Sequence, residues 1–171
     1  MKTIKNLTFL TLSMILTVRI SFAVPVSEGQ NSPDLSIAHV LENGSVKNMN
    51  LLHRENNQDF VLIEFSSVLC KGCVQSLPKL ADLAQRNKDR LQVHLVYIDK
   101  NVKLVEKFIN DNKEYLQYPV ALDPNKIAKN IFGVEKTPTL FLVDKHSKVV
   151  LVHEEVLNDE SIARIEDELR K

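Results

Sequence analysis

The chain has 171 residues, about the length of one ordinary domain. Its hydrophobic share of 44% and charged share of 26% are close to the globular average, which argues against a wholly disordered chain and against a multi-span membrane protein. The 22 basic and 22 acidic side chains cancel, so the sequence offers no excess of positive charge for DNA or RNA, and nucleic acid is not an expected partner.

The first residues have the pattern of an export signal. Two lysines precede a mostly apolar run over residues 7–20, and Ser21 and Ala23 are small residues at the two positions that a signal peptidase reads. We therefore expect a signal peptide over residues 1–23 and a periplasmic or secreted protein. The alternative is an uncleaved membrane anchor, but Arg19 interrupts the apolar run, which is shorter than the roughly 20 residues that a spanning helix needs.

The next segment is polar and then gives way to a predicted hairpin. Residues 24–33 contain Pro, Gly and Ser, which predicts a flexible linker before a single domain over residues 34–171. Strands are expected over 35–41 and 46–51, joined by a tight turn at the Asn-Gly pair of residues 43–44, because these residue types tolerate positive φ. The same pair begins an Asn-Gly-Ser glycosylation sequon, but a turn explains it without a eukaryotic host.

The rest of the chain alternates predicted strands with predicted helices. Residues 60–65 form a nearly continuous apolar run, typical of a central strand buried on both faces. A helix with one apolar face follows from Cys73. Further strands are expected over 91–98, 118–122, 139–143 and 148–156, and further helices over 102–112, 124–132 and 158–171. This alternation predicts an α/β fold with a central mixed sheet flanked by helices.

The two cysteines lie at Cys70-Lys71-Gly72-Cys73, between the predicted strand and its helix. At a helix N-terminus the free NH groups and the helix dipole stabilise a thiolate on the first cysteine, so Cys70 is the predicted nucleophile and Cys73 the resolving thiol. One alternative is a structural disulfide, but so short a loop restrains the unfolded chain very little. The other is half of a metal site, for which two further ligands are missing. We expect neither a metal nor a cofactor.

Two charged residues near the cysteines are candidates for a role in the chemistry. Glu64 lies in the apolar strand, where burial favours the neutral carboxyl and raises its pKa toward the range useful for proton transfer. We expect Glu64 to take and return the proton of Cys73; the alternative is a solvated residue at a strand edge. Lys71 favours the Cys70 thiolate by its charge, although an exposed lysine is also common at helix starts without such a role. With Gly72 it forms the pair expected to modulate the cysteines.

Three features of the sequence resemble the thioredoxin fold family. The strand that runs into Cys70 carries an acid, Glu64, six residues before that cysteine. Pro78 matches the proline that bends the family's active-site helix, and residues 133–139 resemble the segment that carries the family's cis-proline. The resemblance implies a cis Thr137-Pro138 bond that faces the cysteines and presents backbone groups to the substrate. The alternative is an ordinary trans proline at the start of a strand.

Within that superfamily the sequence is most similar to the TlpA/ResA-like group of exported thiol-disulfide oxidoreductases. Residues 102–130 supply an additional helix and strand like that group's insert, and the predicted N-terminal hairpin fits the same group. Three departures concern the usual substrate and the redox potential: Leu69 stands where tryptophan is usual, the pair between the cysteines does not end in proline, and Glu64 stands where asparagine is frequent.

The resemblance implies an enzyme that exchanges protein disulfides through a mixed disulfide on Cys70. Its partners are then protein thiols and disulfides, together with a membrane-borne redox partner. A thiol peroxidase is disfavoured because no Thr-x-x-Cys peroxide pocket precedes Cys70. The alternative from another class is a thioredoxin-fold binding or chaperone module whose disulfide is not catalytic.

Overall fold

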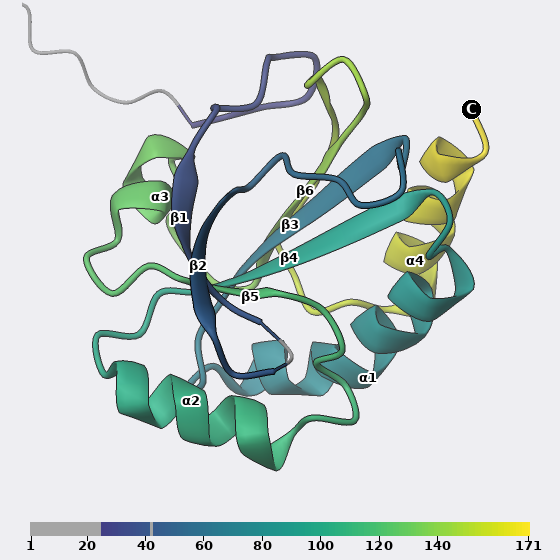
Figure 1. Ribbon diagram of the computed structural model, residues 1–171. Coiled ribbons are helices and arrows are strands. Elements are labelled where there is room, and N and C mark those ends of the chain that lie inside the picture. Colours follow the sequence, from purple (N-terminus) through teal and green to yellow (C-terminus); the bar gives the residue numbers. More distant parts are fainter. Residues whose placement is uncertain (1–24, 42) are drawn as a thin grey trace, which may run out of the picture.

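The computed structural model describes residues 25–41 and 43–171, so the predicted signal peptide lies outside the described residues (Figure 1). The described chain contains one seven-stranded mixed sheet with the spatial order β2-β1-β5-β4-β3-β6-β7. The strands are β1 (Ser36–Val40), β2 (Val46–Asn50), β3 (Phe60–Ser66), β4 (Leu91–Tyr97), β5 (Val120–Leu122), β6 (Thr139–Val143) and β7 (Val149–His153). The predicted α/β fold with a central mixed sheet is therefore confirmed.

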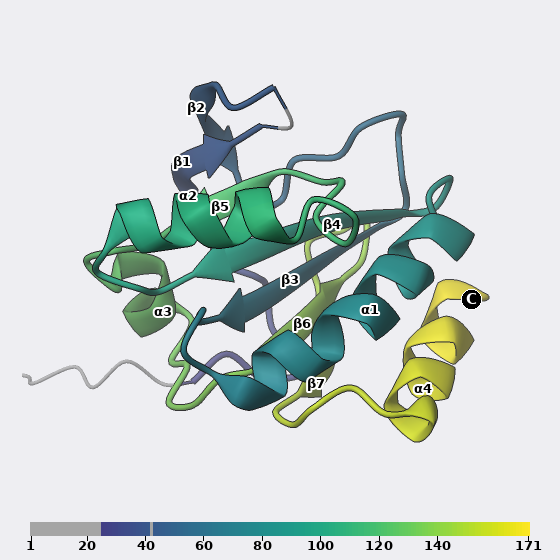
Figure 2. The same ribbon diagram turned by 90° about the horizontal axis from the view of Figure 1, so that it is seen from below.

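Helices cover both faces of the sheet. They are α1 (Lys71–Arg86), α2 (Val102–Asp111), α3 (Ile127–Ile131) and α4 (Asp159–Leu169). One core joins α1, α2 and α4 to the sheet, and a second core holds the single turn of α3 against the opposite face (Figure 2). None of the helices in the described part of the chain has the length and apolar character that a membrane crossing requires.

β3 is the strand that leads to the cysteines, and all of its residues are buried. It pairs in parallel with β4 and antiparallel with β6, so its backbone groups are satisfied on both sides. Side chains alternate between the two cores: Leu62 packs on the α1 face, and Ile63 and Phe65 on the α3 face. Burial on both faces explains why the sequence of this strand is a nearly continuous apolar run.

The N-terminal hairpin is present as predicted. β1 pairs antiparallel with β2, and the turn between them is closed by a hydrogen bond from the Leu41 NH to the Ser45 carbonyl at 2.8 Å. Gly44 has a φ of 78°, a conformation that glycine adopts without a steric penalty. On its other side β1 pairs with β5, which joins the hairpin to the rest of the sheet.

The helix predicted over residues 124–132 is shorter in the structure, where α3 spans only Ile127–Ile131. The side chain of Asp123 accepts hydrogen bonds from the backbone NH groups of Ile127 at 2.7 Å and Lys129 at 2.9 Å. Lys126 adopts a left-handed conformation with a φ of 57°. Asp123 therefore caps a turn that delays the helix start by three residues relative to the prediction.

The prediction of a flexible linker over residues 24–33 needs correction. The Gly29 NH bonds to the Val149 carbonyl at 2.8 Å, and the Val149 NH bonds to the Gln30 carbonyl at 2.9 Å. Asn31 forms a bridge with Lys148, so this segment lies along the outer edge of β7. Ordered structure therefore begins before Asp34, because the segment pairs with backbone groups of an edge strand.

Candidate active site at the Cys70–Cys73 pair

The two cysteines lie where β3 passes into α1. They are joined in a disulfide with their Cα atoms 5.2 Å apart. Cys70 is the N-cap of α1, and its sulfur accepts a hydrogen bond from the Cys73 NH at 3.1 Å. Cys70 is partly exposed, whereas Cys73 is 1% exposed one turn further into the helix. The more exposed of the two cysteines is thus the one at the positive end of the helix dipole.

Asp99 holds the loop that delivers Cys70. Its two carboxylate oxygens accept hydrogen bonds from the Ser67 hydroxyl at 2.8 Å and the Val68 NH at 3.0 Å. The sequence interpretation missed this residue. Its position gave a usable signal, because Asp99 follows β4 at the same sheet edge where the neighbouring parallel strand β3 ends.

Thr137 and Pro138 lie against the cysteines, as expected, and the bond between them is cis. The Cys70 sulfur is 3.5 Å from the Thr137 carbonyl oxygen, although the two residues are 67 positions apart. Pro138 is buried, and Thr137 is partly exposed beside it. A backbone segment that is distant in the sequence therefore borders the Cys70 sulfur.

Gly72 completes the contact between α1 and the Pro138 loop. A Cβ added to Gly72 would lie 2.7 Å from Val156 Cγ2 and 3.7 Å from Pro138 Cδ. Val156 lies before α4 and was not predicted as a site residue; its sequence context carries no signal for it. Leu69, which precedes Cys70, is 80% exposed, and Val74 and Val156 are each 38% exposed, so the site includes exposed apolar side chains.

Glu64 is buried in β3, with 1% of its surface exposed. It pairs with Leu95 of β4 and Leu140 of β6, so the interpretation as a solvated residue at a strand edge is wrong. Burial raises the pKa of the Glu64 carboxyl from its ordinary 4.5 to about 8. Neither carboxyl oxygen has a hydrogen-bond partner among the described residues. The direction of the pKa shift agrees with the prediction, whereas the role in proton transfer stays a proposal.

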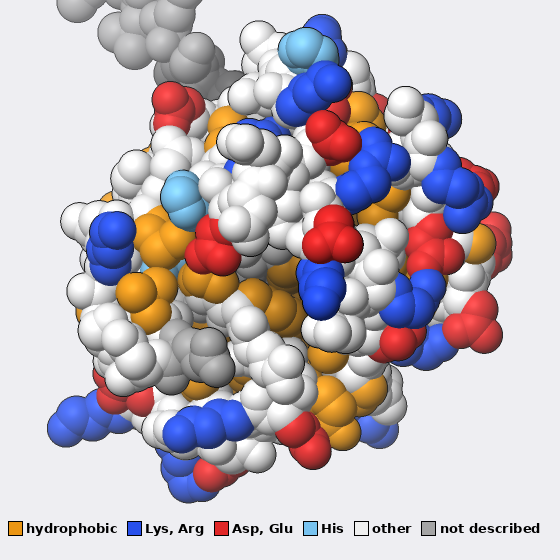
Figure 3. Space-filling view, turned by 45° about the vertical axis from the view of Figure 1, so that its right-hand side comes forward, with side chains coloured by type: hydrophobic (Ala, Val, Ile, Leu, Met, Phe, Trp, Pro, Cys, Tyr) orange, Lys and Arg blue, Asp and Glu red, His pale blue; other side chains and the backbone are white. Residues whose placement is uncertain are grey.

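Lys71, the first residue of α1, is exposed beside Cys70. Figure 3 shows acidic and basic side chains interspersed over one face of the molecule, with hydrophobic side chains in the hollow at its centre. The effect of Lys71 on the Cys70 thiolate remains a prediction.

A comparison with protein families identifies the fold that this geometry represents. A model described as thioredoxin-like matches residues 57–149, more than half of the chain. The chain belongs to the thioredoxin-like family. The match spans β3, the cysteine pair and the Thr137-Pro138 bond, so the resemblance noted in the sequence is confirmed at the level of the fold.

Relatives within this family include proteins named for disulfide chemistry. The chain is 29% identical over 112 residues to the thiol-disulfide oxidoreductase ResA of Bacillus thuringiensis, and the match covers 65% of this chain and 62% of that protein. The chain thus spans somewhat less than two thirds of the length of this curated relative.

Similar solved structures confirm the fold, but they do not distinguish between the activities that proteins with this fold have. A thiol:disulfide interchange protein from Bacteroides sp. is 21% identical with a TM-score of 0.67, covering 85% of this chain and 92% of that one. The mitochondrial 2-Cys peroxiredoxin of Plasmodium falciparum, 12% identical, has a TM-score of 0.69, covering 84% of this chain and 94% of that one. Because proteins named for two different chemistries match equally well, function must be argued from the site.

Proposed function

We propose that this protein is an exported thiol-disulfide oxidoreductase that acts on protein disulfides through Cys70. The observation that carries the proposal is the partly exposed residue Cys70 at the start of α1, whose sulfur is bonded to that of buried Cys73 and lies 3.5 Å from the Thr137 carbonyl oxygen. Similarity to a relative named ResA supports the same chemistry. The N-terminal sequence pattern supports a periplasmic or secreted location. A membrane-borne redox partner is what the resemblance to the TlpA/ResA-like group implies.

In the reducing direction the Cys70 thiolate attacks a substrate disulfide. One substrate sulfur then bonds to Cys70, and the other leaves as a thiolate that takes up a proton from water. Cys73 next gives its proton to the Glu64 carboxylate and attacks the Cys70 sulfur, which forms the 70–73 disulfide and releases the second substrate thiolate. The substrate gains two electrons and the protein loses two, so an external dithiol must reduce the protein again.

Thr137 and Pro138 supply the backbone against which we expect an extended substrate to bind as an added strand. Lys71 and Gly72, at the start of α1, modulate the exchange. Lys71 adds positive charge beside the thiolate, which stabilises the reduced form and makes the couple more oxidising. Gly72 allows Val156 to approach α1 closely.

An insulin-reduction assay with dithiothreitol tests the proposal. We expect the wild-type protein to accelerate insulin precipitation and the Cys70→Ser variant to be inactive. Cys73→Ser is the matched variant: it should retain the attacking sulfur but accumulate mixed disulfides with substrate. A wild-type protein that remains oxidised and inactive, yet prevents aggregation of unfolded client proteins, would instead support the binding or chaperone module. The reduction potential of the pair then assigns the direction of exchange.

A further inference from the structure

The loop before α4, residues 154–158, is tied to the first turn of α1 by a buried hydroxyl. The Ser76 hydroxyl donates a hydrogen bond to the Gly72 carbonyl at 3.1 Å and accepts one from the Leu157 NH at 3.0 Å. Ser76 is fully buried, and the proposed function gives it no role. Because a hydroxyl can donate and accept at the same time, Ser76 satisfies backbone groups of two separate elements.

Two ion pairs join the same loop to its neighbours. Lys136 of the Pro138 loop lies 3.2 Å from Glu154, measured from Nζ to Oε2, and Lys79 of α1 pairs with Asp159, the first residue of α4. Both pairs are exposed, so they contribute little to stability. Ser76 is therefore the contact that fixes the loop most firmly against α1.

This loop places Val156 beside the cysteine pair. Val156 Cγ2 and Pro138 Cδ both border Gly72, the residue before Cys73. The Thr137 carbonyl oxygen, one residue before Pro138, lies 3.5 Å from the Cys70 sulfur. The Val156 side chain is exposed. An exposed apolar side chain is thus held next to the segment that borders the sulfur.

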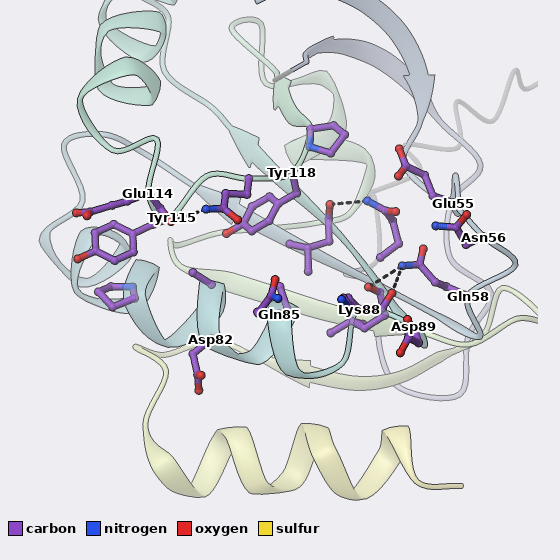
Figure 4. Close-up of a pocket in the computed structure, with 18 residues that line it drawn as sticks. Glu55, Asn56, Gln58, Asp82, Gln85, Lys88, Asp89, Glu114, Tyr115 and Tyr118 are labelled. Carbon is purple, nitrogen blue, oxygen red and sulfur yellow. Dashed lines mark hydrogen bonds between the residues drawn. The ribbon is translucent and has the colours of Figure 1, made fainter. Parts of the chain in front are cut away.

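A groove further along α1 does not reach this site. It has a volume of about 870 Å³ and lies between α1, the loop before β3 and the segment before β5. Figure 4 shows Tyr118 across the groove from Gln85 of α1. Among the described residues that line it there is neither cysteine, and the Pro138 loop is absent as well. A substrate joined to Cys70 must therefore be recognised on the surface around the sulfur.

We propose that Val156 contacts the residue next to the reactive cysteine of the substrate and favours an apolar side chain at that position. The inference rests on the proposed function, in which the substrate is joined to Cys70 and lies along Thr137. Consecutive Cα atoms are about 3.8 Å apart, so a residue next to that cysteine lies against the surface around Cys70. Burial of apolar area against Val156 stabilises it there. Val156 is thus a specificity-determining residue, and Ser76 is a positioning residue that acts through it.

This preference defines a class of substrate. Large apolar side chains are mostly buried in folded proteins, so a cysteine beside one is reached most readily in a polypeptide that has not yet folded. Charge does not oppose this choice: Glu155 adjoins Val156 in the chain, Lys71 adjoins Gly72, and both charged residues are exposed. Because their signs are opposite, we expect apolar contact to discriminate among substrates more than charge does.

Short peptides that differ only next to a single cysteine test the preference. The cysteine carries thionitrobenzoate as a disulfide, and the varied residue is Leu, Ser or Lys, placed before the cysteine in one set and after it in another. The Cys70 thiolate of the reduced protein attacks the peptide sulfur and releases thionitrobenzoate, whose absorbance is followed. Cys73 then displaces the peptide thiolate, so the peptide disulfide gains the two electrons that the protein dithiol loses.

Rates are divided by those of the same peptides with free dithiothreitol. In one of the two sets we expect wild-type protein to react with the Leu peptide roughly threefold faster than with the Ser peptide, less than the roughly tenfold that a methylene contributes in an enclosed pocket. Equal rates for all peptides would overturn the specificity proposal alone. Failure to reduce any peptide, or insulin, faster than dithiothreitol does would refute the proposed function itself.

Variants of Val156 assign the contact. Val156→Ser should abolish the preference for Leu, and Val156→Asp should reverse it in favour of the Lys peptide, because opposite charges attract. Val46→Ser is the matched control, since Val46 is an exposed valine on β2, at the opposite edge of the sheet from β7. A preference that survives in Val156→Ser would overturn the proposal and point to another exposed side chain, such as Leu69.

Ser76→Ala tests the positioning role. It should lower the ratio of Leu to Ser rates toward that of Val156→Ser, whereas a merely structural role would slow all peptides alike. Asn87→Ala is the control, because it removes a hydrogen bond from the Asn87 side chain to the Leu83 carbonyl, 2.9 Å long, at the other end of α1. An unchanged ratio in Ser76→Ala would overturn its role. If Ser76→Ala does not fold, the variants of exposed Val156 still decide the specificity.

Discussion

Two carboxyl groups near the disulfide have opposite surroundings. Asp99 is partly exposed and has both oxygens bonded to the loop before Cys70. Glu64 is buried without a partner among the described residues. A carboxyl group surrounded by apolar atoms is stabilised in its neutral form. Asp99 therefore fixes the loop before Cys70, and Glu64 is suited to accept and release a proton.

Asp99→Ala should loosen the loop that carries Cys70. The substitution leaves the Val68 NH without its carboxylate partner, so we expect the free energy of unfolding to fall by about 1–3 kcal/mol. Disulfide exchange should also slow, because Cys70 is less well positioned. Denaturant unfolding and the insulin assay measure these effects. Asp111→Ala is the control, since its ion pair with Lys107 on α2 is exposed and contributes little. Equal stability of Asp99→Ala and wild type would show that the loop is held by other contacts.

Glu64 should make the oxidised protein less stable as the pH rises. The carboxyl has a pKa of about 8 in the folded protein and an ordinary value of 4.5. Between these pH values the folded state therefore binds more protons than the unfolded chain. The stabilisation that this protonation gives to the folded state is complete below pH 4.5 and is lost as the pH rises through 8. The slope is at most about 1.4 kcal/mol per pH unit. Glu64→Gln should remove this slope in denaturant titrations; an unchanged slope would mean that Glu64 is hydrated in solution.

At the scale of elements, a pair of buried histidines connects the hairpin to the core. His39 of β1 and His94 of β4 are fully buried, with His39 Nε2 and His94 Nδ1 3.1 Å apart. The other ring nitrogens donate to backbone carbonyls, His39 Nδ1 to Ile37 at 3.0 Å and His94 Nε2 to His53 at 2.9 Å. A neutral histidine ring carries one hydrogen on nitrogen, and in each ring this hydrogen is donated to the backbone carbonyl. A hydrogen bond between the two rings therefore requires one additional proton.

Burial opposes that proton and lowers the pKa of both histidines, that of His94 from 6.5 to about 4. The unfolded chain therefore binds more protons than the folded protein in this range. The contribution of the neutral histidines to the free energy of unfolding should be complete above pH 6.5 and decrease as the pH falls toward 4. His94→Gln should weaken this acid dependence in thermal unfolding, whereas His146→Gln, in an exposed turn, should not. A gain in stability on acidification would show that the shared proton outweighs the cost of burying a charge.

At the scale of the whole molecule, the sequence predicted what depends on local pattern. The apolar run of β3 and the spacing of α1 identified the strand and helix that present the cysteines. Resemblance to a family predicted the position of Pro138. The short α3 and the pairing of residues 29–31 with β7 and its turn were missed, because they depend on hydrogen bonds made only after the chain folds. Asp99 was missed although its position after β4 gave a signal, and Val156 was missed because its packing against Gly72 leaves no pattern in the sequence.

The pairing of residues 29–31 along the outer edge of β7 determines where a recombinant chain should begin. A recombinant chain cut back to Asp34, the domain start expected from the sequence, loses the residues that pair with the outer edge of β7. An uncovered edge strand is a template for pairing with another chain. We expect the shortened protein to self-associate in analytical ultracentrifugation, whereas a chain beginning at Val24 should not. Equal sedimentation of the two would contradict this. Assemblies formed by the shortened chain would then be products of truncation and no guide to the native oligomeric state.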